Sequence, residues 1–179
     1  CFDTTEQFIT VLAIPDTRLQ TNLRSVNCAP FTLEAAANGL TNENSTWYIY
    51  DSTLSNPLII RTGTNSVQYT YNRAGSFYVR LVAVNTQGCA DSSEVRFTVW
   101  GTPVAAFSPG NGSTCSLDTS ISFLNNSLAG DNSGLSYRWF VDNLQRATSG
   151  NFTHRFTAPA NALLPLSFTT LLIATNAVG

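Results

Sequence analysis

The chain has no lysine and no methionine, a single histidine, and few charges of either sign. Charged residues make up 11% of its 179 residues, and the formal net charge is −2. The basic residues are all arginines and form no cluster, so the basic surface that binds nucleic acid is not indicated. No apolar run approaches the ~20 residues that cross a bilayer as a helix. We therefore expect neither a nucleic-acid partner nor a membrane span in this chain.

A catalytic constellation is also lacking. The lone histidine, His154, lies between Thr153 and Arg155, and no cysteine or histidine pair has the spacing of metal ligands. No Gly-x-Ser-x-Gly elbow is present, and no motif positions an acid beside His154. We expect His154 to be a surface or edge residue, and the chain to be no enzyme and to need no cofactor.

What the sequence does contain is an internal repeat of about 90 residues. Residues 1–6 (CFDTTE) align with residues 89–94 (CADSSE) at an offset of 88. Further along the chain, Trp47 aligns with Trp139. This period is too long for a solenoid repeat and suits one small domain with its own core. We therefore expect two consecutive units cut from a longer array.

Apolar and polar residues alternate with period two in short runs, which is the pattern of β-strands. Phe77, Val79 and Leu81, for example, fall on one face of a single run. The strands predicted in the first unit are Phe31–Ala37, Thr46–Asp51, Leu58–Arg61, Val67–Tyr71, Phe77–Asn85 and Glu94–Trp100. Those predicted in the second are Val104–Phe107, Ser120–Asn125, Ser136–Asp142, Phe152–Thr157 and Ser167–Asn176. The pattern predicts all-β, immunoglobulin-like β-sandwiches in tandem, with Trp47 and Trp139 in their cores.

The stretch that follows Trp47 resembles the PKD (polycystic kidney disease) domain. Residues 47–51 read WYIYD, and they are followed by Tyr-x-Tyr at 69–71, Gly75, an alternating strand and Asn85 before a glycine turn. The second unit keeps YRWFVDN at 137–143 but lacks the family's glycine after Phe156, and both units lack its Gly-Asp-Gly loop. The cysteine placement is similar to that of PKD arrays in large secreted surface proteins of gliding and adhesive bacteria of the Bacteroidota type. The resemblance implies a fold and an extracellular or cell-surface location, and no chemistry.

The repeat predicts three segments. Residues 1–13 are expected to be the last strand of a preceding repeat, residues 14–101 a PKD-like sandwich, and residues 102–179 a second sandwich without its final strand. Trp100 and Pro103 lie at the inter-domain junction, where a short linker with a proline predicts a semi-rigid connection.

The segment Glu6–Ile14 is, by this alignment, a seventh strand without a domain of its own. In one hypothesis it completes the second unit of a neighbouring chain by strand addition and so gives head-to-tail polymers. The candidate donor residues are Phe8, Thr10 and Leu12.

Four cysteines, one pair per repeat, indicate an oxidising compartment and structural disulfides. Cys28 with Cys89 is one candidate pair, although a sandwich places their loops at opposite ends of a ~20 Å strand and a disulfide requires Cα atoms within ~7 Å. An extended first strand or a distorted loop would have to close that gap. In the alternative, each cysteine of the first loop bonds the turn of the next domain, so that Cys115 pairs beyond Gly179 and Cys1 belongs to the preceding repeat.

Aspartates stand singly at predicted strand ends and turns, where carboxylates commonly accept backbone amides: Asp51, Asp91, Asp118, Asp131 and Asp142. Some PKD-like modules bind calcium at such places, so the resemblance implies calcium as the one candidate metal for these aspartates. Glycans are candidate partners at four Asn-x-Ser/Thr sequons: Asn44, Asn111, Asn125 and Asn151.

The leading hypothesis for function is a structural one. The chain is expected to be a repeat unit of an extracellular stalk, adhesin or cell-surface filament, a semi-rigid disulfide-supported spacer whose partners are neighbouring repeats or subunits. The alternative is a carbohydrate- or protein-binding accessory module of a secreted hydrolase. That alternative requires an exposed aromatic platform, for which the candidates are Tyr48, Tyr50, Tyr69 and Tyr78.

Overall fold

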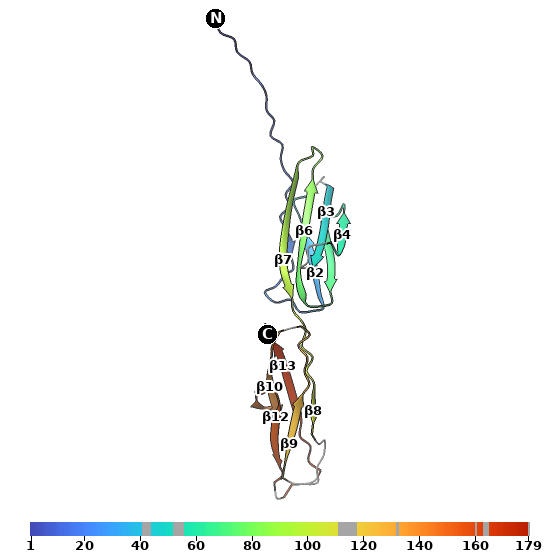
Figure 1. Cartoon of the computed structure of the whole chain (residues 1–179), viewed down its shortest axis with the longest axis vertical. Coiled ribbons are helices and arrows are strands. Elements are labelled where there is room, and N and C mark those ends of the chain that lie inside the picture. The colour runs from blue at the N-terminus through green and yellow to red at the C-terminus, as the bar shows by residue number, and fades with distance from the viewer. Residues whose placement is uncertain are drawn as a thin grey trace. The chain divides into compact units, whose positions relative to one another are not determined.

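A computed structural model describes residues 1–40, 44–51, 56–110, 118–131, 133–159, 161–162 and 165–178. Within these ranges every regular element is a β-strand, and no helix is present that could cross a membrane. The chain divides into two compact units, Cys1–Val99 (unit 1) and Trp100–Gly179 (unit 2) (Figure 1). The prediction of an all-β chain with tandem sandwiches is confirmed.

Unit 1 consists of two antiparallel sheets, with strand orders β4-β3-β6-β7 and β1-β2-β5. Its strands are β1 Gln20–Thr21, β2 Phe31–Ala36, β3 Asn44–Asp51, β4 Ile59–Thr62, β5 Ser66–Tyr71, β6 Gly75–Val84 and β7 Ala90–Val99. β6 and β7 pair along their whole length, from Gly75 opposite Val99 to Val84 opposite Ala90. Strand β7 therefore covers one edge of β6, while β3 covers the other.

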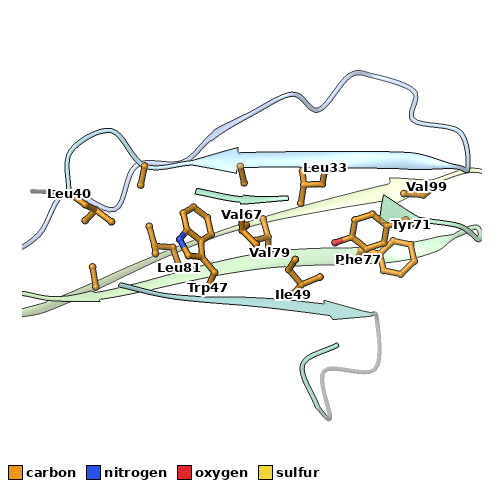
Figure 2. Close-up of a cluster of buried hydrophobic side chains, with 13 residues drawn as sticks. Leu33, Leu40, Trp47, Ile49, Val67, Tyr71, Phe77, Val79, Leu81 and Val99 are labelled. Carbon is orange, nitrogen blue, oxygen red and sulfur yellow. The ribbon is translucent and has the colours of Figure 1, made fainter. Parts of the chain in front are cut away.

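The core of unit 1 lies between the two sheets. Trp47 of β3 and Val79 and Leu81 of β6 are fully buried, and Leu33 of β2 meets them from the facing sheet (Figure 2). Each is an inward residue of an alternating strand, so the period-two pattern places all of them in the same layer. Full burial stabilises the fold by about 1.5–3 kcal/mol for each large aliphatic side chain.

Unit 2 repeats this arrangement, but its described residues contain no counterpart of β7. Its sheets have the orders β11-β10-β13 and β12-β9-β8. Its strands are β8 Phe107–Pro109, β9 Asp118–Asn125, β10 Leu135–Val141, β11 Leu144–Ala147, β12 Phe152–Thr157 and β13 Thr170–Asn176. Phe123, Trp139, Phe152 and Leu172 form the centre of its core.

The two tryptophans mark equivalent positions in the two units. Trp47 lies opposite Leu81 in the β3–β6 pair, and Trp139 lies opposite Leu172 in the β10–β13 pair. Both indoles are fully buried, and each indole N–H donates to a backbone carbonyl, that of Thr64 at 2.8 Å and that of Ser149 at 3.0 Å. The predicted core role of both tryptophans is confirmed. Because Leu81 of β6 and Leu172 of β13 lie opposite these tryptophans, β13 is the equivalent of β6 in unit 2.

The strand predictions differ from the structure in a few places. β1 and β11 were not predicted; β11 follows a two-residue turn in which Asp142 and Asn143 have φ of 49° and 65°, the geometry of a type I′ hairpin. The predicted strand Val104–Phe107 is an isolated bridge from Val104 to Leu128, followed by β8. The predicted strand Glu6–Ile14 lies in no strand, because no described sheet edge pairs with it.

Candidate functional site

The first candidate site is the N-terminal segment, which carries apolar side chains into solvent. Phe2, Phe8, Ile9 and Val11 are between 88% and 98% exposed, and residues 1–19 belong to no strand. The first hydrogen bond from this segment to the sandwich is at Ala13, whose carbonyl accepts from the Asn85 side chain at 2.8 Å. An exposed apolar stretch without packing partners is suited to pairing with a sheet edge.

The second candidate site is the outer edge of β13 in unit 2. β13 pairs with β10 over its whole length, and none of the described strands pairs with its other side. The equivalent strand of unit 1, β6, has neighbours on both sides. The free edge of β13 therefore offers a row of backbone N–H and C=O groups for pairing.

Apolar side chains beside this edge are exposed. Phe168 is 43% exposed, whereas its equivalent in unit 1, Phe77, is only 5% exposed; each lies four residues before the leucine opposite the core tryptophan. In unit 1 the ring of Phe97, on β7, packs against Phe77 at 6.1 Å. The exposure of Phe168 is thus explained by the lack of a covering strand.

The junction predicted at Trp100 and Pro103 is bonded to unit 2 directly after Trp100. The Gly101 N–H donates to the Asp131 carboxylate, and the Gly101 carbonyl accepts from the Asn176 side chain at 2.9 Å. Hydrogen bonds from Ser133, and then the one from Gly101, lower the pKa of Asp131, as expected for a carboxylate that accepts amide protons.

The other side of the junction is equally fixed. Val99, the last residue of β7, is almost fully buried in the core of unit 1. Trp100, itself in a β-bridge, is therefore the one residue between Val99 in the core of unit 1 and Gly101, which is hydrogen-bonded in unit 2.

The cysteines are free thiols at Cys1, Cys28 and Cys89, and Cys115 lies outside the described residues. Cys28 precedes β2 at the end where Phe31 contacts Phe97 with ring centroids 6.2 Å apart, whereas Cys89 lies in the turn before β7. The strand between Ala90 and Phe97 spans about 24 Å, far beyond the ~7 Å that a disulfide allows. The structure does not make the Cys28–Cys89 bridge, and the reason is this separation.

Three of the four candidate tyrosines gather on the outer face of the β4-β3-β6-β7 sheet. Tyr50 stacks on Tyr78 with ring centroids 4.5 Å apart, Tyr48 lies 6.2 Å from Tyr50, and the Arg96 guanidinium lies 5.6 Å from the Tyr78 ring. Tyr69 lies on β5, in the other sheet. Because Tyr50 and Tyr78 each have two such neighbours, their ring faces stabilise the sheet and offer little area to a sugar.

His154 lies on β12, an edge strand of unit 2, as the sequence predicted. Its ring contacts Phe152 at 5.7 Å and Phe156 at 4.7 Å. Burial, and then the nearby charge of Arg146, lower the pKa of His154, with Asp142 acting in the opposite direction. The lowered pKa favours the neutral imidazole, whose ring is part of an aromatic cluster.

The aspartates serve the fold through hydrogen bonds. Asp142 accepts from the Thr169 amide at 2.9 Å, Asp91 from the Thr17 hydroxyl at 2.6 Å, and Asp118 from the Arg155 guanidinium at 2.6 Å. Over the described part of the chain, no three His, Cys, Asp or Glu side chains come together as a metal site.

A hollow of about 460 Å³ lies in unit 1, lined by residues 14–18 and 91–93. Its buried Thr17 is the donor to Asp91, and Arg18 forms an ion pair with Asp16 at 2.5 Å that lowers the pKa of Asp16 to about 2. Thr17 with Asp91 and Arg18 with Asp16 are thus bonded to each other within the lining.

No protein-family model matches the chain, and no curated protein sequence matches it. Among solved structures, the fibronectin(III)-like modules of Clostridium thermocellum CbhA match over 89% of this chain and 86% of theirs, with 12% identity and a TM-score of 0.40. The immunoglobulin-like sandwich is defined by the strands and sheets of the two units. The resemblance to PKD domains stays a prediction.

Proposed function

We propose that this chain is a structural repeat unit of an extracellular stalk, adhesin or cell-surface filament, in which it acts as a semi-rigid spacer. The observation that carries the proposal is the connection between the units. Val99 is held in one core, Gly101 is held by two hydrogen bonds in the next unit, and Trp100 is the whole linker. A linker of one residue has few conformations. We therefore expect the angle between successive units to vary little, as in a semi-rigid spacer.

The core, the loops and the glycosylation sequons of the two units agree with a spacer. Each unit buries its own aromatic core, and loop aspartates such as Asp142 accept hydrogen bonds from within their own unit. The sequons at Asn44 and Asn151 lie on exposed residues, which suits glycosylation outside the cell.

Disulfide support is proposed between successive domains. Cys28 and Cys89 lie at opposite ends of unit 1, which disfavours a bridge within the unit and supports the alternative pairing between domains. Mass spectrometry of unreduced peptides from the native protein identifies the pairs. Cys28–Cys89 as the native bridge would contradict this assignment.

The binding-module alternative has weaker support. The tyrosine cluster of Tyr48, Tyr50 and Tyr78 would be its binding face, yet these rings stack on one another. A sugar that protects tyrosine fluorescence from a soluble quencher would favour the alternative over a spacer.

The first prediction tests the stiffness of the junction. Spin labels at exposed Ser76 and Gln145, introduced as cysteines in a chain with the four native cysteines changed to serine, report the distance between the units. We expect a narrow distance distribution by pulsed electron paramagnetic resonance, and a distribution at least about twice as broad after insertion of Gly-Ser-Gly-Ser behind Trp100.

The control is the same insertion at Gly134, inside a unit 2 loop with open space around it. It should leave the distribution narrow. Equally broad distributions with and without the junction insertion would contradict the semi-rigid spacer.

A further inference from the structure

We propose that residues Phe2–Val11 of one copy of this chain add to the free edge of β13 in another copy, as an antiparallel strand in the place that β7 occupies in unit 1. The inference rests on the proposed function, because it names the contact through which the repeat unit would extend into a filament. The partner is a second copy of this chain.

The two internal alignments fix the pairing register. Leu81 and Leu172 lie opposite the core tryptophans, so residues 75–84 of β6 correspond to residues 166–175. The offset of 88 makes Ala90–Val99 of β7 correspond to Phe2–Val11. The observed pairing of β6 with β7 then assigns a partner to every residue of the donor segment.

On the inner face, this register brings exposed apolar groups together. Phe77 pairs with Phe97 in unit 1, and the equivalent pair is Phe168 with Ile9. Phe168 is 43% exposed and Ile9 is 88% exposed, so each lacks the cover that the other would supply.

The next inner pair repeats the match. Gly75 pairs with Val99 in unit 1, and its equivalent is Leu166 with Val11. Leu166 is 41% exposed and Val11 is 91% exposed. Covering two such pairs removes large apolar area from water, which is the main driving force for association.

The centre of the proposed pair shows a matched change of chemistry. Val79 lies opposite Val95 in unit 1, and the equivalent residues are Thr170 and Gln7. Both residues of the proposed pair, Thr170 and Gln7, are polar, whereas both residues of the unit 1 pair are apolar. The Thr170 hydroxyl and the Gln7 side-chain amide can form a hydrogen bond with each other. A polar residue on one side alone would have left a group without a partner.

The register also decides which donor residues face inward. Ile9 and Val11 take the inner positions of Phe97 and Val99, whereas Phe8, Thr10 and Leu12 take the outer positions of Arg96, Thr98 and Trp100. A slip of one residue would exchange the two faces, so adjacent substitutions test the register.

Strand β13 itself is shorter than its equivalent. β6 begins at Gly75, but β13 begins at Thr170, and residues 166–169 lie in no strand. These four residues are the ones that would face Phe8–Val11. Pairing is therefore expected to extend β13 back to Leu166 and to slow amide hydrogen exchange at residues 166–169.

The test uses the full 179-residue chain and two adjacent substitutions. Sedimentation velocity over a concentration series should show head-to-tail oligomers. Ile9→Asp should weaken association by about tenfold or more, because a carboxylate would be buried against Phe168. Phe8→Asp, on the outer face, should change association by less than about threefold, although Phe8 is just as exposed in the single chain. A chain that stays monomeric, or one that responds equally to both substitutions, overturns the proposal.

A cross-linking experiment checks the register directly. In chains with the four native cysteines changed to serine, Glu6→Cys in one chain and Leu171→Cys in another occupy the positions of Glu94 and Arg80, which lie opposite each other in unit 1. Mild oxidation of the mixture should give a covalent dimer, and Thr5→Cys with Leu171→Cys should give little, because Thr5 faces inward. Equal yields from both mixtures overturn the register.

Failure of this inference is distinct from failure of the proposed function. The distance distribution between Ser76 and Gln145 is measured within one chain and does not depend on association. A stiff but monomeric chain would overturn strand addition and leave the spacer standing.

Discussion

At the scale of single residues, the aromatic positions carry most of the packing. Trp47 and Trp139 have the same environment in the two units. Each ring is fully buried, and its indole N–H donates to a backbone carbonyl. Tyr71 does not follow this rule. Its hydroxyl is buried, has no hydrogen-bond partner among the described residues, and its burial raises the pKa of the phenol. A buried polar group without a partner is destabilising.

Replacement of Tyr71 by phenylalanine is therefore expected to stabilise unit 1 by about 1 kcal/mol. The ring contacts with Phe77 and Phe97, at 4.3 and 5.3 Å, are kept, and the hydroxyl is removed. Chemical denaturation of the full chain measures the change. The matched control is Tyr69→Phe, which removes a hydroxyl from a less buried ring and should have little effect. A clear loss of stability in Tyr71→Phe would mean that the hydroxyl has a partner.

At the scale of elements, two loops of unit 2 approach each other at the backbone level. A Cβ atom on Gly101 would lie 2.4 Å from the Gly130 carbonyl carbon and 2.6 Å from the Asp131 nitrogen. Gly130 has φ of +75°, a conformation that favours glycine. The two glycines allow the contact through which the Asp131 carboxylate holds the Gly101 amide.

Gly101→Ala is expected to cost unit 2 about 1–3 kcal/mol, because backbone atoms cannot move aside as a flexible side chain can. Thermal unfolding, with hydrogen exchange to identify the unit that is affected, measures the loss. Gly134→Ala is the matched control, since a Cβ there meets nothing within 4 Å. If both substitutions have the same small effect, the close approach at Gly101 is not required.

At the scale of the whole molecule, the division into units predicts how the chain unfolds. The buried clusters of the two units share no residue, and each contains one fully buried tryptophan. Domains with separate cores lose stability separately unless an interface couples them.

Trp47→Ala should thus destabilise unit 1 by about 3–5 kcal/mol and leave unit 2 nearly unchanged. Hydrogen exchange at the β10 and β13 amides provides the readout for unit 2, and Trp139→Ala gives the reciprocal experiment. Equal loss of protection in both units from either substitution would indicate one cooperative molecule.

Much of the architecture can be read from local pattern. The alternation around Phe77, Val79 and Leu81 predicted a strand with one buried face, and that face is buried. β11 could not be predicted in the same way, because its four residues are mostly exposed and owe their pairing to the type I′ turn before them. The stacking of the candidate tyrosines could not be predicted from the sequence either. Period two assigns each side chain to one face of its own strand, but it does not say which strands become neighbours.

The sequence by itself determined the number of units, their all-β class and the two core tryptophans, since repeats and periodicity are properties of the chain order alone. Only the tertiary structure decided that Cys28 and Cys89 lie at opposite ends of a sandwich, that Trp100 is the whole linker, and that Phe168 lacks the cover which Phe77 has. These are distances and contacts between residues far apart in sequence. They depend on which strand edges meet, and no local pattern of side chains specifies that.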